Sequence, residues 1–418
     1  MIDLLPIAGY PSVVEGFLPK VEGEFNKPQL KHLARYLTGL IVCENKTVTG
    51  INSSFIGRND QSALNHWLTD SDWSEEKLDK ARKELILEEL NAKRIRRGVL
   101  VIDDTLNHKT GKHMEGVNIH YDHAEGRYAL GHQLVTSHLV AGRFSLPVGF
   151  ELYLRNEGQE DFTSKQELAR ALIGRAAEEG FPFTCVILDS WYFNAENIGC
   201  IEGLGRDWVA GCKSNRLILM PKGWTPISDH LEAVPKTEFK RVIIRTEDGE
   251  RSFWTYAKNV VIKGPRRIRL VVSYQDETME GEPKIIATNR LDWDTKTVLK
   301  TYLKRWKIDS FYRDAKQELG LEDYEVRKMR GLRRHWLLVF LAHTLLRLSP
   351  NLGKPIEWME RGLKTVGSRC RHATMEIIKT FIDLIIKLAQ KVRTADEILR
   401  YTLSDLKELK TLYQMEAT

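Results

Sequence analysis

The chain has 418 residues, of which 42% are hydrophobic and 29% are charged, a balance typical of a globular protein with two or three domains. Its formal net charge of +6 permits a nucleic-acid partner without requiring one. The five cysteines are scattered and form no C-x-x-C pair, which argues against a disulfide framework or a thiolate zinc site. No segment has the pattern of a signal peptide or a membrane span, so we expect a cytosolic protein.

The first part of the chain has the apolar spacing of helices. Residues 29–41 and 62–90 repeat apolar side chains at helical intervals, and short segments around Gly50 and Gly57 separate the expected helices. We therefore predict a helical domain over residues 1–95. A small DNA-binding module and a bundle that only packs are both compatible with this pattern.

From residue 97 onward, strands and helices alternate. The expected elements are strands at 97–105, 129–142 and 144–154, a helix at 162–180, a strand at 183–190, a helix at 194–203 and a strand at 207–213. This order predicts an α/β domain with a mixed sheet.

The alternation stops in the middle of the chain. Residues 215–291 contain four strand-like runs separated by turn-forming residues, which predicts an all-β insertion. Helical patterns then resume, with helices expected at 336–348 and 373–391. The predicted domains are 1–95, an α/β domain in two parts at 96–214 and 292–350, the insertion at 215–291 and a C-terminal helical region at 351–418.

A polar stripe follows the insertion. If residues 302–316 form one helix, then Tyr302, Arg305, Asp309 and Lys316 fall within roughly 60° of one another, beside an apolar arc. An amphipathic helix with an ion pair between Arg305 and Asp309 explains this pattern. One wall of an active site explains it equally well.

Carboxylates elsewhere in the chain favour the active site. Asp103 and Asp104 end one expected strand, and Asp189 ends another, at the sheet edge where α/β proteins usually bind ligands. With Asp309 they supply acidic groups from three separate elements. Such a set suits two Mg²⁺ ions that assist displacement at phosphorus, because Mg²⁺ prefers carboxylate oxygens and water. Arg305, Lys316 and Tyr302 are then placed to contact phosphates or sugars of a nucleic acid.

The motifs together resemble the DDE-superfamily insertion-sequence transposases that carry a Tyr-x-x-Arg-x-x-x-Glu-x-x-x-x-x-x-Lys signature. Here that signature reads Tyr302, Arg305, Asp309 and Lys316 at the same spacing. The segment "VIDDT" is similar to the first Asp motif of relatives with a "DDT" start, and "VILDSWYFN" is similar to the second. The resemblance spans roughly residues 95–350 and agrees in motif, spacing and order.

This resemblance implies an RNase H-like fold with an all-β insertion, and a cut-and-paste DNA transposase. It assigns the catalytic, metal-binding carboxylates to Asp104, Asp189 and Asp309, with two Mg²⁺ ions that Mn²⁺ can replace. Water would attack at the transposon end, and the freed 3′ hydroxyl would join target DNA. The implied partners are double-stranded DNA at inverted repeats and in the target, and further copies of the chain in a homodimer or larger complex.

One position departs from the family pattern. Residue 309 is Asp where the group has Glu, so its carboxylate reaches one methylene less far from the helix. Either the helix lies closer to the metal ions in a working variant, or metal binding is weaker. We favour the working variant, because Tyr302, Arg305 and Lys316 all match the signature.

Weaker signals concern DNA contacts and histidines. The basic run 327–335 follows the signature, and we predict that its Arg330, Arg333 and Arg334 contact DNA phosphates. Six histidines lie between His108 and His138, and we expect solvated side chains there rather than a zinc site. Base recognition is expected within residues 28–95.

Two other functions remain open on the sequence. An RNase H-like, metal-dependent nuclease would cut DNA without joining it to a target. A catalytically inactive, DNA-binding descendant would bind end DNA and leave it intact. Strand transfer separates the first from a transposase, and metal-dependent cutting separates the second.

Overall fold

The computed structural model describes residues 5–56, 61–122, 125–155, 162–246, 249–264, 266–348 and 363–390, together with 394, 397 and 398. The chain forms two compact units. The helical unit comprises residues 1–89, 107–131 and 312–418, and the sheet unit comprises residues 90–106 and 132–311. Each unit is described by itself.

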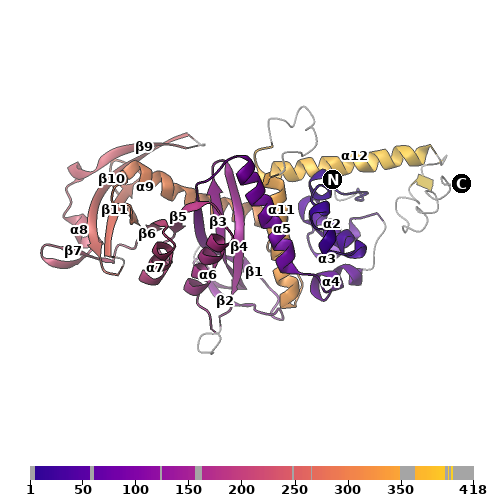
Figure 1. Cartoon of the computed structure of the whole chain (residues 1–418), viewed down its shortest axis with the longest axis horizontal. Helices are drawn as coiled ribbons and strands as arrows, with labels where there is room; N and C mark the ends of the chain where they lie inside the picture. Colours follow the sequence, from indigo (N-terminus) through magenta and orange to yellow (C-terminus); the bar gives the residue numbers. More distant parts are fainter. Residues whose placement is uncertain are drawn as a thin grey trace. The chain divides into compact units, whose positions relative to one another are not determined.

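The first part of the sheet unit has the expected α/β order. Strands run in the order β4-β3-β1-β5-β6, with β1 parallel to β5, β5 parallel to β6, and β3 antiparallel to β4. Parallel neighbours need a crossover connection, and the helices α6 and α7 supply it (Figure 1). The elements are β1 (Gly98–His108), β3 (Arg127–Ala141), β4 (Phe144–Tyr153), α6 (Lys165–Glu178), β5 (Phe183–Leu188), α7 (Ala195–Gly203) and β6 (Asp207–Gly211). The prediction of an RNase H-like mixed sheet is confirmed.

The centre of this sheet is apolar on both faces. Residues 100–102 of β1 and 186–188 of β5 are completely buried. Such continuous apolar runs are typical of parallel strands that are covered on both sides. The first polar side chains of β1 therefore appear only at Asp103, beyond the core.

The insertion continues the same sheet. Beyond β6 the strand order is β12-β11-β10-β7-β8, with β9 paired to β10, and Figure 1 shows β9, β10 and β11 side by side. A short helix interrupts the expected all-β pattern. The elements are β7 (Leu217–Met220), β8 (Gly223–Pro226), α8 (Ile227–Glu232), β9 (Lys240–Thr246), β10 (Gly249–Ile262), β11 (Arg266–Tyr274) and β12 (Lys284–Thr288).

The segment after β12 is not the single helix that would align the whole signature. Helix α9 (Thr295–Tyr302) ends in a 3-10 turn, η5 (Leu303–Arg305), and α10 (Trp306–Leu319) follows. The 3-10 turn winds with about three residues per turn, so the side chains before and after it do not share one helical face. Helix α9 packs on β6 and β12, and its first turn is capped by Asp294, which accepts a hydrogen bond from the Thr297 amide at 2.6 Å.

The helical unit is built around α11, which packs against α2, α4 and α12. The helical pattern over 62–90 corresponds to two helices, α4 and α5, and strand β2 was not anticipated. Residues 351–362 and most residues after 390 of the expected C-terminal region lie outside the described residues. The bounds are α2 (Lys27–Val42), α3 (Val48–Ser53), α4 (Gln61–Thr69), α5 (Glu75–Ala92, which ends in the sheet unit), β2 (Asn118–Asp122), α11 (Met329–Leu348) and α12 (Val366–Ala389), after a first turn α1 (Ser12–Glu15).

No helix in the described part of the chain is both long and apolar enough to cross a membrane. Helix α11 is buried along most of its length because it lies among other helices. Its apolar residues therefore pack against protein, as the length of the 336–346 run indicated.

Candidate active site

The parallel pairing of β1 and β5 brings the first carboxylates to one level of the sheet unit. The pairing stops at Ile102 and Leu188, and Asp103 and Asp104 come next on β1, while Asp189 follows β5 directly. The position of Asp189 after its strand is as expected from the sequence. The expectation that the first strand ends at Asp103 and Asp104 is wrong, because β1 continues to His108 beyond the end of β5.

The loop after β5 links Asp189 to Asp104. The backbone amides of Trp191 and Tyr192 donate to Asp189 Oδ1 at 2.9 and 3.1 Å. The buried hydroxyl of Tyr192 then donates to Asp104 Oδ1 at 2.9 Å. One short loop therefore orients both carboxylates.

The other oxygen of Asp104 meets donors from two further elements. Lys165 Nζ lies 2.9 Å from Asp104 Oδ2, and the Gln133 side-chain amide donates to the same oxygen. Lys165 is the first residue of α6, whose start is fixed by a reciprocal capping pair between Ser164 and Glu167. The ammonium of Lys165 thus lies at the Asp104 oxygen that would otherwise be free to bind a metal ion.

Arg305 connects the signature segment to the middle of β1. Its Nη1 lies 2.6 Å from Asp103 Oδ2, and its Nη2 lies 3.5 Å from Asp309 Oδ2. Asp309 lies in the first turn of α10, and its side chain is 45% exposed, far more than that of Asp103 at 13%. The guanidinium therefore stands between a buried and an accessible carboxylate.

Tyr302 lies in the wall behind these groups. It is buried, and its hydroxyl approaches Gly211 so closely that a Cβ atom there would lie 2.9 Å from Tyr302 Oη and 3.0 Å from the Ser190 amide nitrogen. Only glycine leaves room for Tyr302 beside the loop that follows Asp189. Burial raises the pKa of Tyr302 to about 12, so the hydroxyl stays protonated and can donate a hydrogen bond.

Burial raises the affinity of Asp103 and Asp189 for protons. Burial raises the pKa of Asp103 to about 8, Asp104 and Asp189 add to the increase, and Arg305 opposes it. Burial also raises the pKa of Asp189, with a further contribution from Asp104. Asp103, Asp104 and Asp189 thus lie close enough for their charges to repel one another, and a divalent cation would relieve this repulsion.

The remaining residues of the predicted DNA contacts lie in the helical unit. Lys316 is on α10, where its Nζ lies 2.5 Å from Glu322 Oε1. On α11, Arg330 is exposed and Arg333 is half-buried. A phosphate contact by Arg334 is not supported, because this side chain is only 2% exposed and donates to the carbonyls of Trp67, Leu68 and Trp73.

The histidine-rich stretch differs from the expectation of solvated side chains. His120, His132 and His138 are buried, and His138 Nε2 lies 2.7 Å from Ser145 Oγ in the sheet unit. His123 lies outside the described residues. Strand β2 and its pairing with β3 explain the burial of His120, since this hairpin was not anticipated from the sequence.

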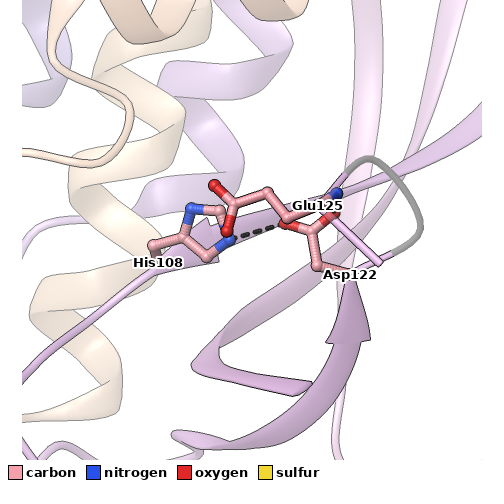
Figure 2. A group of neighbouring side chains, drawn as sticks. All are labelled: His108, Asp122 and Glu125. Carbon is pink, nitrogen blue, oxygen red and sulfur yellow. Dashed lines mark hydrogen bonds and ion pairs between the residues drawn. The ribbon is translucent and has the colours of Figure 1, made fainter. Parts of the chain in front are cut away.

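A second polar group lies in the helical unit. Figure 2 shows His108, Asp122 and Glu125, whose ligand atoms lie within 4.8 Å of one another; among the described residues it is the only such group of three metal-ligand types. His108 Nε2 already lies 2.7 Å from Asp122 Oδ2, and Glu125 is paired with Arg127 at 2.5 Å. These contacts pair the three side chains of the group without a metal. Asp104, Asp189 and Asp309 do not meet that spacing.

Sequence reasoning missed several residues of the site. Tyr192 follows Asp189 by three residues and could have been suspected from this proximity. Lys165 and Gln133 gave no local signal, because their contacts with Asp104 join residues 61 and 29 positions apart. Asp103 was noticed in the sequence, but its pairing with Arg305 depends on the tertiary structure.

Comparisons with known proteins point in the same direction as this geometry. A family model described as DDE superfamily endonuclease matches residues 20–230. The chain is 25% identical over 291 residues to the probable transposase for insertion sequence element IS701 of Microchaete diplosiphon, covering 68% of this chain and 73% of that protein. Its fold is similar to a piggyBac transposase from a synaptic complex with hairpin DNA, with a TM-score of 0.50, 9% identity, and coverage of 91% of this chain and 76% of the other.

Proposed function

The chain belongs to the DDE superfamily of endonucleases and is a DNA transposase, and from this premise we propose that it works by cut and paste, with Asp104, Asp189 and Asp309 as its catalytic carboxylates. In this proposal the chain cuts at the ends of its element and joins the freed 3′ hydroxyl to target DNA. The observation that carries it is the bridge made by Arg305, which joins Asp309 of α10 to Asp103, the neighbour of Asp104 on β1.

The residues fit divalent cations. Asp104 and Asp189 offer oxygens at one sheet edge, and Asp309 adds an accessible carboxylate. Lys165 and Arg305 supply positive charge to this cluster, and Asp104 and Asp189 still disfavour the charged form of Asp103, a repulsion that divalent cations would relieve. When bound, two Mg²⁺ ions, or Mn²⁺ in their place, supply charge stabilisation for the attacking and leaving oxygens of the phosphate.

The basic side chains around the cluster have separate tasks in this proposal. Arg305 presents a planar guanidinium that can turn from Asp309 to a phosphate of the cut strand, because Asp309 lies at 3.5 Å rather than at close hydrogen-bond distance. Tyr302 holds the Asp189 loop and keeps its proton, so we assign it a positioning role. Lys316, Arg330 and Arg333 bind phosphates farther along the DNA.

Asp309 in place of Glu is compatible with activity in this arrangement. Its side chain is accessible and already reaches Arg305, which also contacts Asp103. The shorter carboxylate therefore belongs to the same charged network as Asp103 of β1. We propose that it serves as the third ligand of a DDD variant.

The test is DNA cleavage by the full-length protein. A plasmid carrying the gene with its native flanking DNA is incubated with wild type or Asp309→Ala and Mg²⁺, and the cut positions and joined products are mapped. We expect cuts at inverted repeats and joining to target DNA by the wild type, both lost in the variant. Equal cutting by both proteins would move the third ligand elsewhere.

Other outcomes select the alternative functions. Ends that are cut but never joined to target DNA would indicate a nuclease without strand transfer. Binding without any metal-dependent cut would indicate an inactive descendant. The size of the complex on paired ends tests the further proposal that the active form is a homodimer or larger.

A further inference from the structure

Trp191 is exposed in a loop whose other aromatic side chains are buried. The indole is 53% exposed, whereas Tyr192 and Phe193 are 0% and 4% exposed. The backbone of Trp191 is nevertheless held on both sides, since its amide donates to Asp189 Oδ1 and its carbonyl accepts from Gln166 Nε2 at 3.0 Å. These two backbone hydrogen bonds therefore hold the loop in the conformation that exposes the Trp191 indole.

The indole forms one side of a pocket of about 310 Å³ in the sheet unit. Gln166 and Asn194 lie on its wall, and the Asn194 side chain donates to Gln166 Oε1 at 2.8 Å. Asn197 donates to the same oxygen at 2.6 Å. The wall is therefore organised before any ligand binds, and the volume is at the small end of ligand pockets.

Two cations complete the pocket. The ammonium of Lys213 lies 5.4 Å from the centre of the Trp191 ring, and the guanidinium of Arg216 lies 5.1 Å from the centre of the Phe193 ring. Neither has a carboxylate partner among the described residues, and the buried Nε of Arg216 donates to no acceptor there. The pocket thus combines an open aromatic face with positive charge that the protein itself does not neutralise.

We propose that this pocket binds one nucleotide of the DNA strand that is cut, with its base on Trp191 and its phosphate at Lys213 and Arg216. Aromatic faces stack on nucleobases of any sequence, and unpaired cations attract phosphate. Inside a duplex both faces of a base are covered by neighbouring bases, so the bound base is unpaired or terminal. Because Trp191 lies two residues from Asp189, this nucleotide adjoins the phosphate that reacts.

This inference rests on the proposed function for the place of the nucleotide, and it can be tested without cutting. The full-length protein is mixed, without metal, with a short duplex whose terminal base is the fluorescent analogue pyrrolocytosine. We expect quenching by the wild type, loss of quenching in Trp191→Ala, and retention of most of it in Trp191→Phe. Affinity for single-stranded oligothymidylate should fall about tenfold or more in Trp191→Ala.

Matched variants separate stacking from charge. Trp224→Ala removes another exposed indole, on β8 and outside the pocket, and should leave quenching unchanged. The double variant Lys213→Gln with Arg216→Gln should reduce the salt dependence of single-strand binding by a slope of roughly 1.4. An unchanged slope would remove the two cations from the DNA contact.

The outcomes distinguish this inference from the proposed function. Wild-type cutting at element ends together with unchanged quenching in Trp191→Ala would overturn the pocket and leave the function intact. Loss of self-association in Trp191→Ala with unchanged quenching would make the pocket a protein contact and overturn the inference. Quenching that depends on Trp191 in a protein that never cuts would contradict the function alone.

Discussion

Arg305 of the sheet unit and Arg334 of the helical unit are both arginines withdrawn from solvent, and they are held in different ways. Arg334 donates to three backbone carbonyls, lies 3.1 Å from Glu75 and stacks over Trp73 at 4.0 Å. Arg305 instead forms ion pairs with two carboxylates, those of Asp103 and Asp309. Carbonyls of the folded backbone are always available to Arg334, whereas the partners of Arg305 are groups that a divalent cation also attracts.

The difference teaches how to distinguish structural from functional charge in this chain. A buried cation that donates to several backbone carbonyls, as Arg334 does, stabilises one conformation. A cation such as Arg305, whose partners are carboxylates in an acidic cluster, can be exchanged for another positive charge. Basic sequence runs do not show which case applies, because both arginines occur in segments rich in charge.

Arg305→Met should produce the largest effect, on catalysis. We expect DNA cleavage to fall roughly a hundred- to a thousandfold, because a donor placed at the reacting phosphate is lost. The free energy of unfolding should change little, since Asp103 can take up a proton when its partner is removed. Cleavage rates and urea unfolding of the same preparation measure both quantities. Full cleavage activity in this variant would make Arg305 a structural residue like Arg334.

Arg334→Met should act on stability. Its removal leaves Glu75 and three carbonyls without their donor, so we expect the free energy of unfolding to fall by about 3 kcal/mol. Arg330→Met, on the same helix but exposed, is the matched control and should change stability little. Urea unfolding gives the comparison. A loss of DNA affinity without a loss of stability in Arg334→Met would contradict the structural role.

His335 should make the stability of the helical unit depend on pH. Its Nδ1 lies 2.9 Å from Tyr36 Oη and its Nε2 lies 2.8 Å from the Gly320 carbonyl, so the neutral ring with a proton on Nε2 satisfies both contacts. Burial lowers the pKa of His335 to about 3; the Gly320 carbonyl opposes this shift and Lys109 adds to it.

The sign of this dependence follows from proton binding. The unfolded chain takes up the proton below about pH 6.5, while the folded chain does not, so stability decreases as the pH falls from 6.5 toward 3. The slope should be about 1.4 kcal/mol per pH unit from this group. Urea unfolding at pH 7 and pH 5 should show a smaller difference for His335→Gln than for the wild type. Equal differences would show that His335 is not the responsible group.

Lys165→Met should produce the smallest effect, on metal affinity. Removing the ammonium from Asp104 removes a competing positive charge, so we expect Mn²⁺ to bind about tenfold more tightly. Electron paramagnetic resonance of free Mn²⁺ measures this without DNA. Arg170→Met, on the same helix and paired with Glu196, is the control. Unchanged or weaker Mn²⁺ binding would show that Lys165 does not compete with the metal.

The sequence predicts those features that depend on the local spacing of apolar residues. The buried strand segments that precede Asp103 and Asp189 follow from uninterrupted apolar runs, and the fold class and the DDE-superfamily transposase prediction are confirmed. The assignment of the catalytic residues stays a prediction.

Other features depend on contacts between distant segments. The ion pair of Lys165 with Asp104 has no local pattern, and the 3-10 turn at Leu303–Arg305 interrupts a stretch whose periodicity is helical. Arg334 was expected on a DNA-facing surface because the sequence does not reveal that α4 packs against that side of α11. The direction in which a charged helix residue points is decided by its neighbours.

The pairing of β12 with β6 has an evolutionary consequence. Ile286, Ala287 and Thr288 pair with Gly211, Ala210 and Val209, so the chain leaves the core sheet and returns to it on neighbouring strands, about 4.8 Å apart. The segment between these two strands can gain or lose residues while its two ends stay joined. Relatives can therefore differ widely in the length of this excursion and still deliver α9 and α10 to the same place.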